Sequence, residues 1–161
     1  GEMKQIFEIL ENNAQATPQQ ISKMTGIPAT DVEKIIKQAE KDRTILKYKT
    51  MINWSKLGEE QVWAIVEVKV VPQRNVGFDA IAERIYRFPQ ARSVYLVSGT
   101  YDLAVLVVGK TMQEIAAFVT EKLAPLETVQ GTATYFLLKR YKEDGEILEE
   151  KGGLKRLPIT P

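Results

Sequence analysis

The chain has 161 residues, 44% hydrophobic and 27% charged, with a net charge of +1, which bounds it to an ordinary globular protein with one medium domain or two small ones. It contains no cysteine and no histidine, so disulfides, thiolate metal sites and a thiol nucleophile are excluded, and the commonest general base and metal ligand is missing. No stretch approaches the roughly 18 apolar residues of a membrane span, and no signal-peptide pattern opens the chain, so we expect a cytoplasmic protein without catalytic residues, metal, cofactor or membrane partner.

Charge is spread evenly along the chain. Residues 1–60 hold nine Lys plus Arg and nine Asp plus Glu, and the remainder holds thirteen and twelve. Neither part is a basic domain, so DNA binding by the first part would depend on a local group of cations. Small domains commonly gain stability by association with further copies, so we expect an oligomer.

Residues 1–44 have the pattern of a helix-turn-helix domain. A first helix, residues 3–12, has apolar residues at positions i, i+3, i+4 and i+7, namely Met3, Ile6, Phe7 and Leu10. A second helix begins at Thr17-Pro18, where a Thr cap precedes Pro and Gln20 is placed to complete a capping box. Gly26 ends that helix and Ile27-Pro28 forms the turn, which is helix-turn-helix spacing.

A third helix, residues 29–42, is predicted to carry the DNA contacts. At about 100° per residue its apolar residues share one side, and four polar residues fall within an arc of about 60° on the opposite side. We call these four residues the lysine ridge: Thr30, Lys34, Lys37 and Lys41. Such a ridge can contact phosphates or base edges in a major groove. The alternative is a solvated face with i, i+4 pairs such as Glu33 with Lys37.

Residues 45–60 are predicted to form a linker that begins with a strand. Residues 45–49 alternate at period two, which places Lys47 and Lys49 on one face of a short strand. This strand would serve either as a wing that contacts phosphates or as a plain connection.

Residues 61–142 have the pattern of a ferredoxin-like domain. The pattern predicts strands over 62–71, 94–97, 103–108 and 132–138, a helix from Phe78 that closes at Phe88-Pro89, and a helix capped by Thr111 and ended by Pro125. The order is β-α-β-β-α-β, the split-βαβ arrangement, and the whole chain is therefore α+β. The strands over 103–108 and 132–138 are apolar on both faces, which predicts that the sheet buries one face against a second copy in a two-fold dimer.

Together these elements resemble the Lrp/AsnC family of feast/famine transcriptional regulators. The likeness covers residues 3–142 and is carried by the order of elements and by Gly26-Ile27, Leu57-Gly58, the loop over residues 98–102 and Thr134. The resemblance implies a winged-helix DNA-binding domain, a linker strand, and a sensor domain that dimerises through its sheet, with dimers often assembling into octamers. Where relatives usually have Gly after the third helix, this chain has Arg43.

The resemblance also implies an amino-acid effector. The candidate ligand-binding residues are the loop between the second and third sensor strands and one threonine of the last strand: Ser98, Gly99, Thr100, Tyr101, Asp102 and Thr134. An Asp carboxylate can pair with an ammonium group, and backbone N–H groups at a glycine turn can hold a carboxylate. The alternative is a simple hairpin turn in which Gly99 supplies an unusual backbone angle and Asp102 bonds the backbone locally.

The sequence thus predicts an oligomeric, DNA-binding transcriptional regulator, a homodimer and then an octamer, controlled by a small effector. A second interpretation is an amino-acid-binding or assembly module that reads little DNA sequence, which the neutral first domain favours. An enzyme is the least favoured, because decarboxylases that share this plan are expected to use histidine. Residues 143–161 are predicted to form a turn-rich tail.

Overall fold

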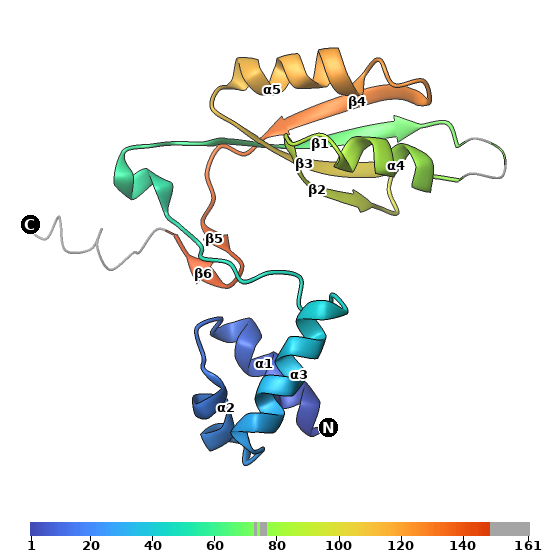
Figure 1. Ribbon diagram of the computed structural model, residues 1–161. Coiled ribbons are helices and arrows are strands. Elements are labelled where there is room, and N and C mark those ends of the chain that lie inside the picture. The colour runs from blue at the N-terminus through green and yellow to red at the C-terminus, as the bar shows by residue number, and fades with distance from the viewer. Residues whose placement is uncertain (73, 75–76, 149–161) are drawn as a thin grey trace, which may run out of the picture. The chain divides into compact units, whose positions relative to one another are not determined.

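The computed structural model describes residues 1–72, 74 and 77–148 (Figure 1). The chain divides into two compact units, Gly1–Ile52 and a second unit that begins at Asn53. In the part of the chain that is described, no helix is both long enough and apolar enough to cross a bilayer.

The first unit is a bundle of three helices, α1 (Glu2–Asn12), α2 (Pro18–Thr25) and α3 (Ala29–Lys41). Its core is a small apolar cluster from all three helices and the turn between the last two: Ile6, Leu10, Ile21, Ile27 and Val32. The predicted helix-turn-helix is therefore confirmed.

The start and end of α2 follow from the residues that predicted them. The backbone nitrogen of Gln20 donates to the Thr17 hydroxyl over 3.2 Å, and the Thr17 nitrogen donates to the Gln20 side chain over 2.9 Å. This reciprocal pair satisfies two backbone donors that the first helical turn leaves without partners. Gly26 ends α2 with φ of 82°, a left-handed conformation that glycine adopts with little strain.

The strand predicted over residues 45–49 is wrong. The structure assigns no strand to residues 42–61. Alternation at period two favours an extended chain, but a strand also needs a partner for its backbone groups. Here the segment is fixed by bonds to α3 instead: the Ile45 nitrogen donates to the Ala39 carbonyl over 3.0 Å, and the Tyr48 phenol donates to the Glu40 carboxylate over 2.9 Å.

The second unit contains a four-stranded antiparallel sheet in the order β2-β3-β1-β4. Its elements in chain order are a 3-10 turn η1 (Trp54–Leu57), β1 (Val62–Val70), α4 (Asp79–Tyr86), β2 (Ala91–Leu96), β3 (Leu103–Gly109), α5 (Met112–Phe118), a π-helical continuation η2 (Val119–Leu123) and β4 (Val129–Phe136). This is the predicted β-α-β-β-α-β order, so the ferredoxin-like prediction is confirmed.

The two faces of this sheet differ in burial. One face packs on α4 and α5 through Ala64, Val66 and Val68 of β1 and the alternate residues of β3, around a T-shaped contact of Phe88 with Phe118. The opposite face, here called the open face, carries the remaining alternate residues of the four strands: Trp63, Ile65, Glu67, Lys69, Tyr95, Ala104, Leu106, Val108, Ala133 and Tyr135. Within the described chain nothing covers the middle of the open face, where Ile65 is 38% exposed.

A short hairpin follows the sheet. The strands β5 (Lys142–Glu143) and β6 (Glu146–Ile147) pair across Asp144 and Gly145, whose φ angles of 48° and 82° are both positive. An Asp-Gly pair with two positive φ angles is the usual two-residue hairpin turn. The rest of the predicted tail, residues 149–161, lies outside the described residues.

Candidate DNA-binding and effector sites

The lysine ridge lies on the outer side of α3. All four of its side chains, Thr30, Lys34, Lys37 and Lys41, are exposed. On the opposite side of the helix, Val32 and Ala39 are buried. The cations thus share one solvent-facing stripe, as the helical spacing predicted.

One ridge lysine has an acidic neighbour. Lys37 Nζ lies 3.8 Å from the Glu33 carboxylate, and the two side chains are 73% and 54% exposed. Such an exposed i, i+4 pair contributes only a few tenths of a kcal/mol. A DNA phosphate can therefore replace Glu33 as the partner of Lys37 at small cost.

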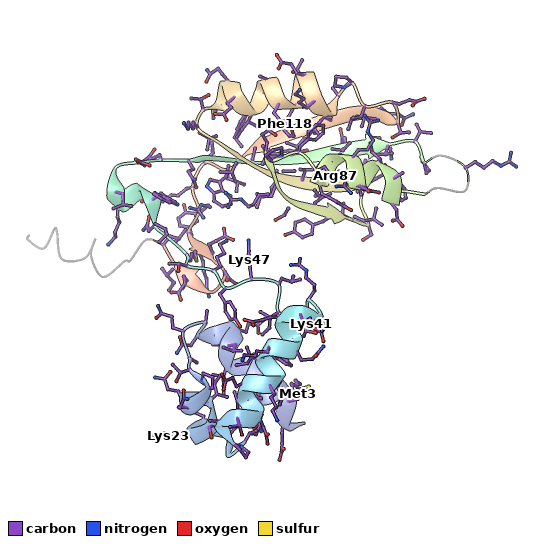
Figure 2. All side chains as sticks on the ribbon, in the orientation of Figure 1. Met3, Lys23, Lys41, Lys47, Arg87 and Phe118 are labelled. Atoms are coloured by element: carbon purple, nitrogen blue, oxygen red, sulfur yellow. The ribbon has the colours of Figure 1, made fainter. Side chains whose placement is uncertain are left out.

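Lys47 and Lys49 flank Tyr48, one of the residues that tie the following segment to α3. Both lysines are exposed, and Tyr48 between them is bonded to Glu40. Figure 2 labels Lys41 at the end of α3 and Lys47 on the segment beyond it. Although no strand forms, the segment still presents its lysines from a fixed point on α3.

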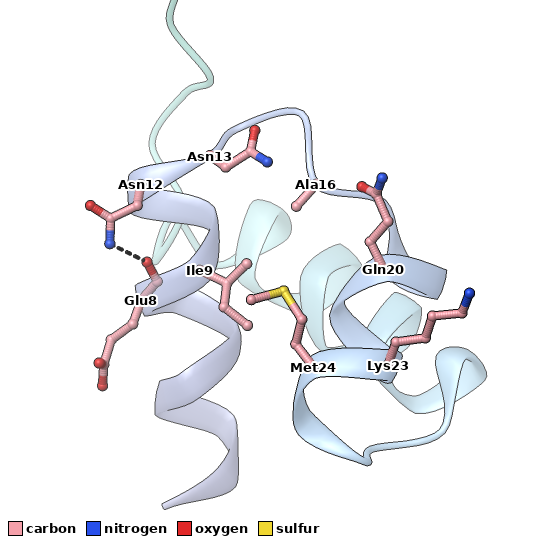
Figure 3. A pocket seen from close by; sticks show the side chains of 8 residues that line it. All are labelled: Glu8, Ile9, Asn12, Asn13, Ala16, Gln20, Lys23 and Met24. Carbon is pink, nitrogen blue, oxygen red and sulfur yellow. Dashed lines mark hydrogen bonds between the residues drawn. The ribbon is translucent and has the colours of Figure 1, made fainter.

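A hollow of about 610 Å³ lies on another side of the first unit (Figure 3). Its lining comes from α1, α2 and the loop between them, with Ile9 and Met24 pointing toward each other. No residue of α3 contributes to it. This hollow is therefore separate from the lysine ridge.

In the second unit, the predicted effector loop joins β2 to β3 and is held against β1 by Asp102. Its carboxylate accepts a hydrogen bond from the Val70 nitrogen over 2.8 Å, and its own nitrogen donates to the Val68 carbonyl over 3.0 Å. Lys69 Nζ donates to the Thr100 carbonyl over 2.8 Å. The side chain of Asp102 thus bonds the neighbouring strand β1, 32 residues away in sequence, whereas the hairpin-turn alternative foresaw a local bond.

Gly99 differs from what that alternative expected. Its φ is not in the left-handed region, and a Cβ added to it would meet only the Tyr101 carbonyl oxygen at 3.8 Å, an ordinary contact. Neither backbone conformation nor packing requires glycine there. Ser98, Gly99 and Thr100 are exposed, whereas Tyr101 and Asp102 are half-buried.

Thr134 lies apart from the loop within one chain. It is half-buried on β4 and pairs with Val66 of β1, on the face that the helices cover. The loop instead contacts β1 at Val68 and Val70, the nearer of which is about 7 Å further along the strand. The structure therefore brings residues 98–102 together but does not add Thr134 to them.

The sequence interpretation missed three side chains near the loop, Glu67, Lys69 and Tyr135. The negative charge of Glu67 is the main cause that raises the pKa of Tyr135, and Tyr101 also contributes. Tyr135 pairs with Ile65 at the middle of the open face, and Glu67 and Lys69 follow along β1 toward the loop. The period-two pattern of β1 placed Glu67 and Lys69 opposite its buried valines, and this signal was available in the sequence. In the described part of the chain, no group of three or more acidic residues is arranged to hold a metal ion.

Comparison with known proteins places the chain in a family. Residues 63–147 match the Lrp/AsnC ligand binding domain. The chain is 48% identical over 158 residues to the HTH-type transcriptional regulator YugG of Bacillus subtilis, with 98% of this chain and 95% of the relative covered.

Two solved structures have a similar fold. A transcriptional regulator of Neisseria meningitidis, in complex with L-methionine, gives a TM-score of 0.71 at 18% identity, covering 91% of this chain and 94% of the other. A feast or famine regulatory protein of Mycobacterium tuberculosis, complexed with L-methionine, gives 0.70 at 17% identity, covering 91% and 96%. Together with the domain match, the near full-length likeness to YugG shows that the chain belongs to the Lrp/AsnC family of transcriptional regulators.

Proposed function

We propose that this protein regulates transcription by placing the lysine ridge of α3 in the major groove of DNA. The observation that carries the proposal is the single exposed stripe of three lysines and one threonine on the last helix of a helix-turn-helix. Lysines position a protein on phosphates, and a threonine hydroxyl can contact a base edge. The proposed role is that of a regulator rather than an enzyme. Because a regulator must reach DNA, the proposal includes a cytoplasmic location.

A homodimer, and then an octamer, is the proposed assembly. The open face exposes 38% of Ile65, 56% of Tyr95 and 53% of Tyr135, and a second copy of the same face would cover this apolar area in a two-fold arrangement. Several DNA-binding domains in one assembly would bind together, which offsets the weak attraction from a neutral first unit.

An amino acid is the proposed effector, bound at residues 98–102 with Thr134 supplied by the assembled form. Gly99 supports this site, because a glycine that neither conformation nor packing requires leaves its backbone open to close approach by a ligand. Lys69 and Glu67 beside the loop have the charges that a carboxylate and an ammonium group need. The L-methionine complexes of two proteins with this fold are consistent with such a ligand.

The DNA contact is tested by a salt series on DNA from the protein's own promoter. Replacing Lys34 and Lys37 with Ala is expected to weaken binding and to reduce the salt slope by about 1.8, the value for two lost phosphate contacts. Lys23→Ala is the matched control, because Lys23 is an exposed lysine of α2 that lines the hollow away from the ridge. An unchanged affinity and slope in the double variant would show that the ridge is not the DNA surface.

The alternative is an amino-acid-binding module with little DNA-sequence reading. It would be selected by tight amino-acid binding in calorimetry together with equal affinity for promoter and unrelated DNA.

A further inference from the structure

A second hollow, of about 390 Å³, lies in the second unit at the far end of the sheet from the effector loop. It is formed where η1 and the chain that enters β1 meet the segment that follows β4. Trp63 near the start of β1 lines it, whereas the effector loop contacts β1 at Val68 and Val70. Five residues of strand separate Trp63 from Val68, roughly 17 Å. The two places are therefore distinct.

Backbone hydrogen bonds hold the walls of this hollow in place. The Leu137 nitrogen donates to the Trp63 carbonyl over 2.8 Å, and the Glu59 nitrogen donates to the Trp54 carbonyl over 3.2 Å. On a third side, the Leu148 nitrogen donates to the Tyr141 carbonyl over 2.9 Å. The hollow is thus a formed feature of the sensor domain, with a volume in the range of small-molecule sites.

Arg140 is the charged group that the hollow leaves incompletely bonded. Its guanidinium carbon lies 4.3 Å from the centre of the Trp63 ring, and its side chain is only 24% exposed. The one ion partner found for it in the described chain is Glu143, at 3.6 Å, which is longer than a hydrogen bond. A guanidinium has five N–H donors in a planar fork that matches a carboxylate. A guanidinium held against an indole, with donors still open to the solvent of the hollow, favours a ligand carboxylate.

The other lining groups define the rest of the ligand. Glu59 and Glu60 are exposed at the hollow and can receive an ammonium group. Trp54, which is 39% exposed, offers an indole surface to an apolar side chain. A carboxylate, an ammonium group and an apolar portion on one small molecule describe an α-amino acid with a large apolar side chain.

We infer that the sensor domain has a second amino-acid site in this hollow, with Arg140 holding the carboxylate and Glu59 and Glu60 holding the ammonium group. The site lies where the chain enters the sensor sheet. It goes beyond the proposed effector loop and does not depend on DNA binding or on that loop.

Tryptophan fluorescence is used to follow occupancy of this site. The chain has two tryptophans, and both Trp54 and Trp63 line the hollow. L-phenylalanine, L-leucine and L-methionine are titrated separately into the full chain without DNA, with excitation that selects tryptophan. At least one of them is expected to give a saturable change. Phenethylamine, which lacks the carboxylate, is expected to give none.

Variants assign that change to the named groups. Arg140→Gln is expected to raise the dissociation constant at least about tenfold, the usual loss for a charge-assisted hydrogen bond. Arg92→Gln is the matched control, because Arg92 also lies over Trp63, at 5.3 Å, but does not line the hollow. It is expected to change the dissociation constant less than twofold. If Arg140→Gln does not fold, the Glu59→Gln/Glu60→Gln variant of two exposed residues gives the same test.

Three outcomes would overturn the inference. The first is that none of the three amino acids changes the fluorescence. The second is that the change persists with equal affinity in Arg140→Gln and in Glu59→Gln/Glu60→Gln, and the third is that Asp102→Asn abolishes the change while Arg140→Gln does not. The last result would mean that the tryptophans report binding at the effector loop. Failure of promoter binding leaves all of these titrations interpretable, because they contain no DNA.

Discussion

The carboxylate of Asp102 accepts a hydrogen bond from the backbone nitrogen of Val70 over 2.8 Å. In the ladder with β3, the last residue of β1 that has a partner is Val68, opposite Leu103. Val70 therefore extends past the start of β3, and Asp102 supplies the acceptor that a strand would otherwise give. The same carboxylate belongs to the proposed effector loop, so its structural and ligand roles need to be separated.

Replacing Asp102 distinguishes these two roles. Asp102→Ala is expected to lower the free energy of unfolding of the second unit by about 1–2 kcal/mol, because the Val70 N–H is left without its acceptor. Asp102→Asn keeps an acceptor oxygen and is expected to cost less, while it weakens amino-acid binding by removing the charge. Denaturant unfolding and calorimetric titration measure the two effects. Equal stability of Asp102→Ala and the unchanged protein would contradict the structural role.

Arg43 is a position where substitution is expected to stabilise the first unit. Its φ is 68°, in the left-handed region that residues with a Cβ adopt at a cost. Arg43→Gly removes that strain and is expected to raise the free energy of unfolding by about 0.5–1 kcal/mol, net of the greater freedom of glycine in the unfolded chain. Thermal unfolding is the measurement. Gly26→Ala is the opposite control and is expected to lower the free energy of unfolding. Its φ of 82° strains a residue with a Cβ, while open space around the added Cβ excludes a clash.

Thr17 and Thr30 of the helix-turn-helix are expected to respond differently to substitution. Thr17→Ala removes the capping box of α2 and is expected to cost about 1 kcal/mol of stability. Thr30→Ala, on the exposed ridge, is expected to leave stability within about 0.5 kcal/mol and to weaken promoter binding. Thermal unfolding and a binding isotherm on both variants check the pair. A stability loss as large in Thr30→Ala as in Thr17→Ala would contradict the assignment of Thr17 to the helix cap and of Thr30 to the exposed ridge.

Assembly through the open face is tested by placing a charge at its centre. Ile65→Lys is expected to convert the oligomer to a smaller species, because a lysine at the middle of a two-fold apolar interface would be buried without a partner. Light scattering after size-exclusion chromatography measures the mass. Leu138→Lys is the control, since Leu138 is 89% exposed and follows β4 rather than lying on the face. An unchanged mass for Ile65→Lys would exclude the open face as the interface.

The Tyr48–Glu40 contact predicts a pH dependence at the alkaline end. Burial raises the pKa of Tyr48 above its usual 10.0, and the bond to Glu40 and the charge of Glu40 raise it further. A raised pKa means that this contact stabilises the folded state fully below pH 10 and that its contribution disappears as pH rises through the higher folded pKa. The tyrosinate absorbance titration of the protein minus that of Tyr48→Phe isolates this group. Glu40→Gln is expected to lower the midpoint, and no change would show that Glu40 does not contact Tyr48 in solution.

Local signals predicted most of the fold. The caps of α2 and the alternation of β1 act within a few residues, and both elements begin where the sequence indicated. Non-local pairing explains the differences. β4 begins at Val129 rather than at residue 132, because a register shift between Lys69 and Val70 lets β1 pair with it further back. The strand predicted over residues 45–49 had the right alternation but no partner.

The sites show the same difference between local signals and non-local contacts. The lysine ridge depends on the spacing within one helix, so the sequence predicted its exposure. The second hollow depends on Trp63 and Arg140, which are far apart in the chain and are brought together only by the pairing of β1 with β4. No periodicity in the sequence could have indicated that contact.

The Trp63 ring is a point of contact between the two edges of the sensor sheet. It receives the Arg92 guanidinium from β2 and the Arg140 guanidinium from beyond β4, so one indole on the central strand is contacted from both edges of the sheet. The two cation–π contacts on this ring therefore join both edges of the sheet to the central strand β1 at the end where the chain enters from η1.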